Sequence, residues 1–130
     1  MSAHRRITAA LVSVAAAAGL ALTAAPAQAA HGTFCTNVLL QQGGSQTTAN
    51  TCIHTVQRTM YKITADAISS AKPCAQLYSG SPSPTAGTLI ANNCSNTDGS
   101  SVTLTGTLPG FPGVHNHSTH QGRFNGSFDY

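Results

Sequence analysis

The clearest alternation of apolar and polar side chains lies in residues 101–108. Val102, Leu104 and Leu108 fall on one face of an extended strand, whereas serine and threonine fill the other face. A period of two is typical of a β-strand with one buried and one solvated face. The turn-forming residues 96–99, Asn-Thr-Asp-Gly, come directly before this segment. We therefore predict a strand here that begins after a tight turn.

Five further segments have the composition of strands. Threonine, valine, isoleucine and aromatic residues are frequent in them, and glycine, proline or asparagine follows several of them. They are residues 33–40, 51–64, 75–78, 87–91 and 123–130. The run 51–64 is either one long strand or a bent pair of strands. In residues 123–130, Phe124, Gly126 and Phe128 fall on one face, and Phe124, Phe128 and Tyr130 form either an apolar contact strip or part of the core. Residues 64–72 also fit a short helix, since Thr64 is an acceptable N-cap and Pro73 would end the helix. The pattern predicts an all-β domain, a small antiparallel β-sandwich or barrel with at most one short helix.

The N-terminal segment has the pattern of a secretory signal peptide. An arginine pair and an apolar run, residues 7–25, precede a small-x-small sequence that ends at Ala29. Cleavage is expected after Ala29, with cleavage after Ala30 as the alternative. We therefore predict a leader over residues 1–29 and one secreted, extracellular domain over residues 30–130. Because no other apolar run reaches about 18 residues, we expect no membrane association after cleavage.

All four cysteines fall in the predicted secreted domain. They are Cys35, Cys52, Cys74 and Cys94. An even number of cysteines in a small exported domain predicts two disulfides. The spacing favours sequential pairing, the first cysteine with the second and the third with the fourth, with each bond contributing roughly 3 kcal/mol. The intervals contain no C-x-x-C pair, which argues against a zinc site built on these cysteines.

The charge pattern excludes several classes of function. The formal charge of +3 falls to +1 once the two leader arginines are removed, and only Arg58 and Lys62 lie close together. Nucleic-acid binders concentrate Lys and Arg in a patch, so we expect no nucleic-acid partner. The chain has no glutamate, which argues against paired-carboxylate hydrolases, and it has no G-x-S-x-G motif. We predict no catalytic residues.

Three histidines form the densest cluster of polar side chains near the C-terminus: His115, His117 and His120. In an extended strand His115 and His117 point to the same face, and His120 could approach from a following turn. Neutral imidazole is a good ligand for zinc or copper, so one interpretation is a zinc or copper site. The alternatives are solvated histidines without a ligand, or groups whose protonation near a pKa of about 6.5 changes binding.

The dipeptide His31-Gly32 offers a second copper hypothesis. If cleavage falls after Ala30, the mature chain starts at His31, and this start resembles that of copper-dependent lytic polysaccharide monooxygenases. The resemblance implies that the amine and ring of His31 bind copper, together with one of the clustered histidines. It covers only this dipeptide and its position. The chain is shorter than members of that family, and it lacks the tryptophan from which they build a flat surface.

Two proline-containing segments are candidate binding loops, because a stiff loop loses little conformational entropy when it binds. The residues are Pro82 and Pro84 in segment 79–85, and Pro109, Phe111 and Pro112 in segment 108–114.

The interpretation that fits all these features is a small secreted non-catalytic binding or structural domain. It would act outside the cell through loop and surface contacts with a protein partner, a cell-wall polymer or another copy of itself, and without a cofactor. The alternative is a secreted zinc- or copper-binding protein, or an enzyme, built on the clustered histidines. The Ala-rich leader is typical of bacterial export.

Overall fold

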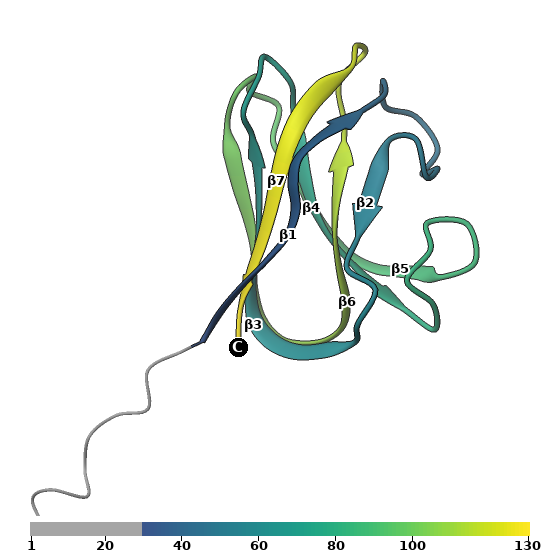
Figure 1. The fold of residues 1–130 in the computed structure, drawn as a ribbon, viewed down its shortest axis with the longest axis vertical. Helices are drawn as coiled ribbons and strands as arrows, with labels where there is room; N and C mark the ends of the chain where they lie inside the picture. The colour runs from purple at the N-terminus through teal and green to yellow at the C-terminus, as the bar shows by residue number, and fades with distance from the viewer. Residues whose placement is uncertain (1–29) are drawn as a thin grey trace, which may run out of the picture.

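A computed structural model describes residues 30–130 (Figure 1). The predicted leader, residues 1–29, lies outside the described residues. The strands are β1 (His31–Leu40), β2 (Thr51–Ile53), β3 (Arg58–Ala67), β4 (Pro73–Ser79), β5 (Thr88–Cys94), β6 (Ser101–Asn116) and β7 (Gly122–Asp129). Residues 30–130 contain no helix, and therefore none that could span a membrane. The prediction of an all-β antiparallel fold is confirmed.

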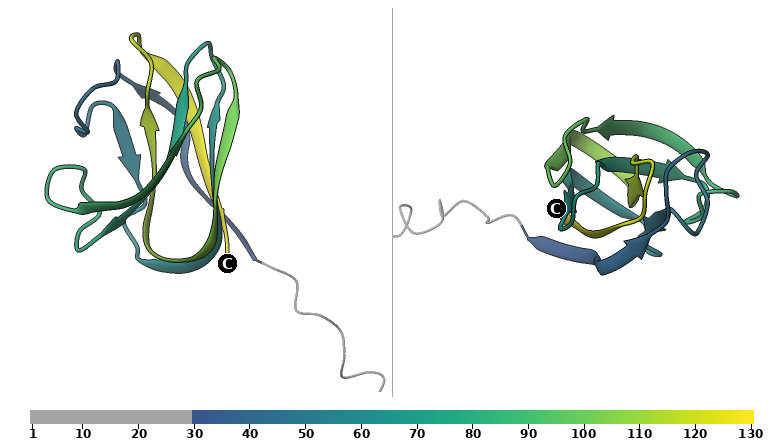
Figure 2. Two further views of the ribbon diagram at one scale, coloured as in Figure 1. Left: turned by 180° about the vertical axis from the view of Figure 1, so that it is seen from behind. Right: turned by 90° about the horizontal axis from the view of Figure 1, so that it is seen from above.

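The long strand β6 belongs to both halves of the sheet. The order is β1-β7-β3-β6-β4-β5, and β2 also pairs with β6. The first part of β6, residues 101–110, pairs with β3, whereas residues 111–116 pair with β4. Between them Gly110 has a φ of 149°, and a Cβ atom there would lie 2.5 Å from the carbonyl oxygen of Tyr78. The strands bend in this region, so that the two halves of the sheet face each other (Figures 1 and 2).

The core lies on the inner face of the curled sheet. Along β7, Phe124 and Phe128 are buried, as the alternation in residues 123–130 predicts. Gly126 lies between them, and a Cβ atom there would be 2.7 Å from Cζ of Phe34 and 2.8 Å from Cγ2 of Val114. Glycine at this position therefore lets β1 and the second part of β6 pack directly onto β7. Each fully buried large apolar side chain contributes roughly 1.5–3 kcal/mol.

Both predicted disulfides are confirmed. Cys35 is bonded to Cys52 and Cys74 to Cys94, and residues 30–130 contain no free cysteine. The first bond joins β1 to β2, strands that pair with β7 and β6 respectively. The second joins residues that are direct partners in the β4–β5 ladder. Two disulfides in a small domain are typical of extracellular proteins.

The prediction of a helix in residues 64–72 is wrong. Residues 64–67 complete β3, where they pair with β6 on one side and with β7 on the other. Residues 68–70 form a bend, and Pro73 begins β4. A helix this short is marginal by itself, whereas a central strand satisfies its backbone donors and acceptors on both sides. In the β-rich run 51–64 the structure has the bent pair of the two predicted alternatives, because β2 and β3 are separated by a bend.

A buried asparagine holds the loop of residues 41–50 against the end of β6. Nδ2 of Asn116 donates hydrogen bonds to the carbonyl oxygens of Gln41 and His120, each at 2.8 Å. The Asn116 backbone amide donates to the carbonyl oxygen of Asn50 at 3.0 Å. Both asparagines are almost fully buried. This network fixes the segment that carries the clustered histidines.

Candidate functional site

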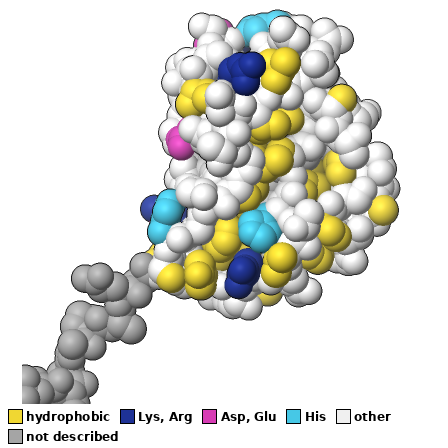
Figure 3. All heavy atoms as spheres, viewed as in Figure 1, with side chains coloured by type: hydrophobic (Ala, Val, Ile, Leu, Met, Phe, Trp, Pro, Cys, Tyr) yellow, Lys and Arg dark blue, Asp and Glu magenta, His cyan; other side chains and the backbone are white. Residues whose placement is uncertain are grey.

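A shallow hollow opens where β1 and β2 meet. Its volume is about 260 Å³, and it is lined by Thr33, Phe34, Cys35, Cys52, Ile53, His54 and Thr55. Pockets for drug-sized ligands measure about 300–1,000 Å³, so this hollow has room for one ring-sized group. Figure 3 shows the face on which β1 and β2 lie. Apolar side chains are exposed along a depressed strip there, with a histidine and a basic side chain near its lower end.

Four aromatic rings, those of Phe34, His54, Phe128 and Tyr130, contact one another beside this hollow. His54 lies between two phenylalanines, with ring centroids 6.0 Å from Phe34 and 5.3 Å from Phe128, both in edge-on geometry. Phe128 in turn contacts Tyr130, with centroids 5.5 Å apart. The two phenylalanines are buried, whereas Tyr130 is 47% exposed. We call His54, Arg58, Phe128 and Tyr130, together with the hollow, the aromatic end.

The aromatic end carries one cation directly on a ring. The guanidinium carbon of Arg58 lies 5.6 Å from the ring centroid of Tyr130, a cation–π distance. Burial and the charge of Arg58 lower the pKa of His54, in that order. Nδ1 of His54 also accepts a hydrogen bond from the Val56 amide at 2.9 Å. The imidazole therefore serves as a neutral ring that shapes the surface, and this nitrogen is not free to act as a base.

A triad of His31, Lys62 and Asp129 lies next to the aromatic end, where the last residue of β7 pairs with β1 on one side and with β3 on the other. Asp129 Oδ1 is 2.6 Å from Nδ1 of His31, and its Oδ2 is 2.8 Å from Nζ of Lys62. The hydrogen bonds from Lys62 and then from His31 lower the pKa of Asp129, and the bond to Asp129 raises the pKa of Lys62. Because Asp129 is neutralised by this pairing, Arg58 leaves this end of the molecule with a positive charge.

The predicted histidine cluster is spread over three environments. His115 is 3% exposed, its Nδ1 shares a hydrogen bond of 2.8 Å with Oγ1 of Thr51, and burial followed by the nearby His117 lowers its pKa to about 4. His117 is exposed, and Nε2 of exposed His120 contacts the carbonyl oxygen of Ser70. Within residues 30–130 these three imidazoles do not form a ligand group with each other, so their metal binding stays a prediction.

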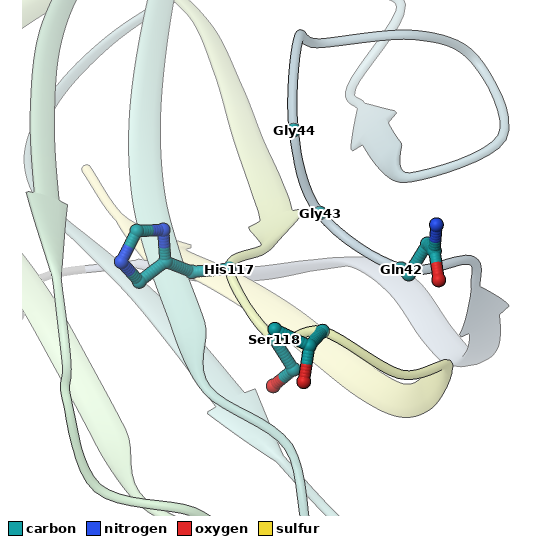
Figure 4. Close-up of a pocket in the computed structure, with 6 residues that line it drawn as sticks. Gln42, Gly43, Gly44, His117 and Ser118 are labelled. Carbon is teal, nitrogen blue, oxygen red and sulfur yellow. The ribbon is translucent and has the colours of Figure 1, made fainter.

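His117 also borders a larger hollow of about 430 Å³, lined by Gln42, Gly43, Gly44, His117, Ser118 and Thr119. Figure 4 shows the His117 ring pointing away from the two glycines, toward the neighbouring strands. Backbone therefore lines much of this hollow, and its side chains do not converge on a common point.

The two proline segments differ in structure. Pro82 is exposed and Pro84 half-buried in a turn between β4 and β5, as the loop prediction expects. The prediction of a loop in residues 108–114 is wrong, because the segment lies inside β6. Pro109 is exposed, Phe111 is half-buried and Pro112 is fully buried. Proline and glycine here accompany the bend of a continuous strand and do not end it.

The hypothesis of a copper site at His31 stays a prediction. In the structure the ring of His31 pairs with Asp129, and the backbone of Ala30 pairs with Tyr130 through hydrogen bonds of 2.8 and 2.9 Å.

Sequence reasoning missed Arg58 and His54 as parts of one site. Phe124, Phe128 and Tyr130 are predicted either to form a contact strip or to pack in the core, and the structure divides them: the phenylalanines are buried and Tyr130 is exposed. Arg58 and Tyr130 are far apart in the chain, and only the pairing of β3 with β7 brings them together. The one sequence signal was an aromatic residue at the chain end.

Comparisons with known proteins add little. No family model matches the chain, and no curated protein matches it. Among solved structures, the chain is similar to one described as the crystal structure of PirA, with a TM-score of 0.44 and 7% sequence identity. That similarity covers 77% of this chain and 93% of the other chain.

Proposed function

We propose that this chain is an exported, non-catalytic binding domain that contacts a cell-wall polymer through its aromatic end. The leader, residues 1–29, would be removed on export, and the two disulfides would brace the curled, sandwich-like sheet outside the cell. The supporting observation is the arrangement of Tyr130: its ring is 47% exposed, packs on Phe128 and lies under Arg58.

The chemistry of the aromatic end suits a glycan that carries carboxylates. The part of the Tyr130 ring that Arg58 and Phe128 leave exposed can contact the C–H groups of a sugar ring, and the threonine hydroxyls of the hollow can bond sugar hydroxyls. The free charge of Arg58 would pair with a carboxylate of the polymer. Peptidoglycan combines all three features, since its sugar chains bear short peptides with free carboxylates.

The aromatic end is a more rigid surface than the proline loop of residues 79–85, which favours it as the binding site. Tyr130 and Arg58 lie at the ends of strands that pair with each other, and the nearby Cys35–Cys52 bond ties β1 to β2. Little conformational entropy is lost when such a surface binds.

The test is co-sedimentation of the protein with insoluble peptidoglycan. We expect wild-type protein to pellet with the polymer and Tyr130→Ala to bind about tenfold more weakly, which corresponds to about 1.4 kcal/mol. Ile90→Ala is the matched control, because Ile90 is 50% exposed on β5, a strand that contacts β4 and β6. If wild-type protein stays in the supernatant, or if the two variants behave alike, the proposal is wrong.

A further inference from the structure

Three side chains with metal-binding atoms converge at the end of β4. Cys74 and Cys94 are direct partners across the β4–β5 pair, and His117 follows the end of β6, on the other side of β4. Their two sulfur atoms and an imidazole nitrogen all lie within 4.8 Å of one another. Within residues 30–130 no other set of three such side chains comes as close.

We propose that Cys74, Cys94 and His117 form a zinc site when the Cys74–Cys94 bond is reduced. Thiolate and imidazole are the usual ligands of Zn²⁺, which prefers four ligands in tetrahedral geometry. Three protein ligands leave the fourth position to water. The intact disulfide closes the site, because its sulfurs carry no thiolate charge. Oxidation of this pair therefore decides whether metal binds.

A dithiol reduces the Cys74–Cys94 bond by two steps of thiol–disulfide exchange. One thiolate of the dithiol attacks a sulfur of the Cys74–Cys94 bond and displaces the other cysteine as a thiolate. The second thiol of the reagent then displaces the first cysteine, and the reagent leaves as a cyclic disulfide. Two electrons and two protons pass to the protein. Zn²⁺ then binds both thiolates, and the two thiol protons are released to solvent.

The surroundings hold the three ligands together without the sulfur–sulfur bond. The β4–β5 ladder continues from the cysteines through Ala75 and Gln76, so backbone pairing keeps the two thiols opposite each other. The backbone amide of His117 donates to the carbonyl oxygen of Lys72 at 2.8 Å, one residue before β4 begins. The site is also accessible, since Cys94 is partly exposed and His117 exposed.

His115 is not part of the set. It is the direct partner of Cys74 on β6, but its Nδ1 is hydrogen-bonded to Thr51 and its side chain is buried. The proposed site therefore uses one of the three clustered histidines, with sulfur in place of the other two.

The experiment measures binding of Co²⁺ and Cd²⁺ to the protein before and after treatment with a dithiol that is then removed anaerobically. We expect no stoichiometric binding to the oxidised protein. We expect one ion per reduced chain, with a cadmium NMR signal typical of two sulfurs and one nitrogen. His117→Ala should weaken binding at least tenfold, since loss even of outer groups around a metal costs about 10–100-fold. His120→Ala should bind as wild type does.

The double variant Cys74→Ser/Cys94→Ser tests whether Cys35 and Cys52 bind the ion instead, because it keeps only these two thiols after reduction. We expect it to bind no ion stoichiometrically. The proposal is overturned if His117→Ala binds as tightly as wild type, or if cadmium reports four sulfurs, as an unfolded chain with four thiols would. Failure of the reduced wild-type protein to bind either ion also overturns it.

Discussion

Nδ1 of His115 and Oγ1 of Thr51 lie 2.8 Å apart across the β2–β6 pair, and both side chains are almost fully buried. β2 is only three residues long and pairs with β6 alone. This hydrogen bond, together with the Cys35–Cys52 bond, is therefore a main side-chain link that holds β2 in the fold. It also makes the fold sensitive to acid, because a buried imidazole is disfavoured in its charged form.

Acid should destabilise the fold through His115. Its pKa in the folded chain is about 4, below the ordinary 6.5, so the unfolded chain takes up the proton first as pH falls. Neutral His115 therefore makes its full contribution to the free energy of unfolding above pH 6.5. That contribution falls by up to about 3 kcal/mol as the pH drops from 6.5 to 4. His115→Gln should flatten this dependence in urea unfolding at pH 7 and pH 4.5. An equal loss of stability in both proteins would contradict the assignment.

Two other groups affect this measurement in known directions. The lowered pKa of His54 also makes the fold less stable as the pH falls, and this loss should remain in His115→Gln. Asp129 also has a lowered pKa, so its contribution is lost as pH falls through that lowered value, below the ordinary 3.8. The window between pH 6.5 and 4 therefore excludes Asp129 but includes His54, and the difference between wild type and His115→Gln in this window isolates the effect of His115.

Removal of the Asn116 side chain should strongly destabilise the fold. Asn116→Ala removes the donor from the buried carbonyl oxygen of Leu40 and from the partly buried carbonyl oxygens of Gln41 and His120, and an unsatisfied buried group costs about 1–3 kcal/mol. We expect a loss of about 3 kcal/mol in the free energy of unfolding, measured in urea. The exposed Asn96→Ala should change it by less than about 0.5 kcal/mol. Similar values for both variants would mean that the network does not hold the loop.

Loss of the Cys35–Cys52 bond should also be costly. This bond closes a loop with a sequence separation of 17, and restriction of the unfolded chain by such a loop contributes about 3 kcal/mol. Cys35→Ala/Cys52→Ala should therefore lower the free energy of unfolding by about that amount, measured under oxidising conditions that keep Cys74–Cys94 intact. A change below about 1 kcal/mol would show that β1 and β2 are held together by other contacts.

Local periodicity was sufficient to predict most of the strands. The alternation in residues 101–108 and 123–130 requires only that neighbouring side chains point to opposite faces, and β6 and β7 follow it. The disulfide pairing was also predictable from local information, because each bond joins one cysteine to the next cysteine along the sequence.

Features that depend on strand pairing were not predictable. Pro109, Gly110 and Pro112 look like the end of a strand, yet β6 continues through them because Gly110 permits a bend at a close backbone contact. The approach of His117 to Cys74 and Cys94 depends on β4 lying between β5 and β6. A single sequence contains no direct signal for that order.

The account of function rests on contact through the aromatic end, and NMR of the labelled protein with soluble peptidoglycan fragments tests it most directly. We predict that the largest chemical-shift changes fall on His54, Arg58 and Tyr130, and that Tyr130→Ala reduces them at equal ligand concentration. Changes centred on residues 79–85, or no changes at saturating fragment, would contradict the account.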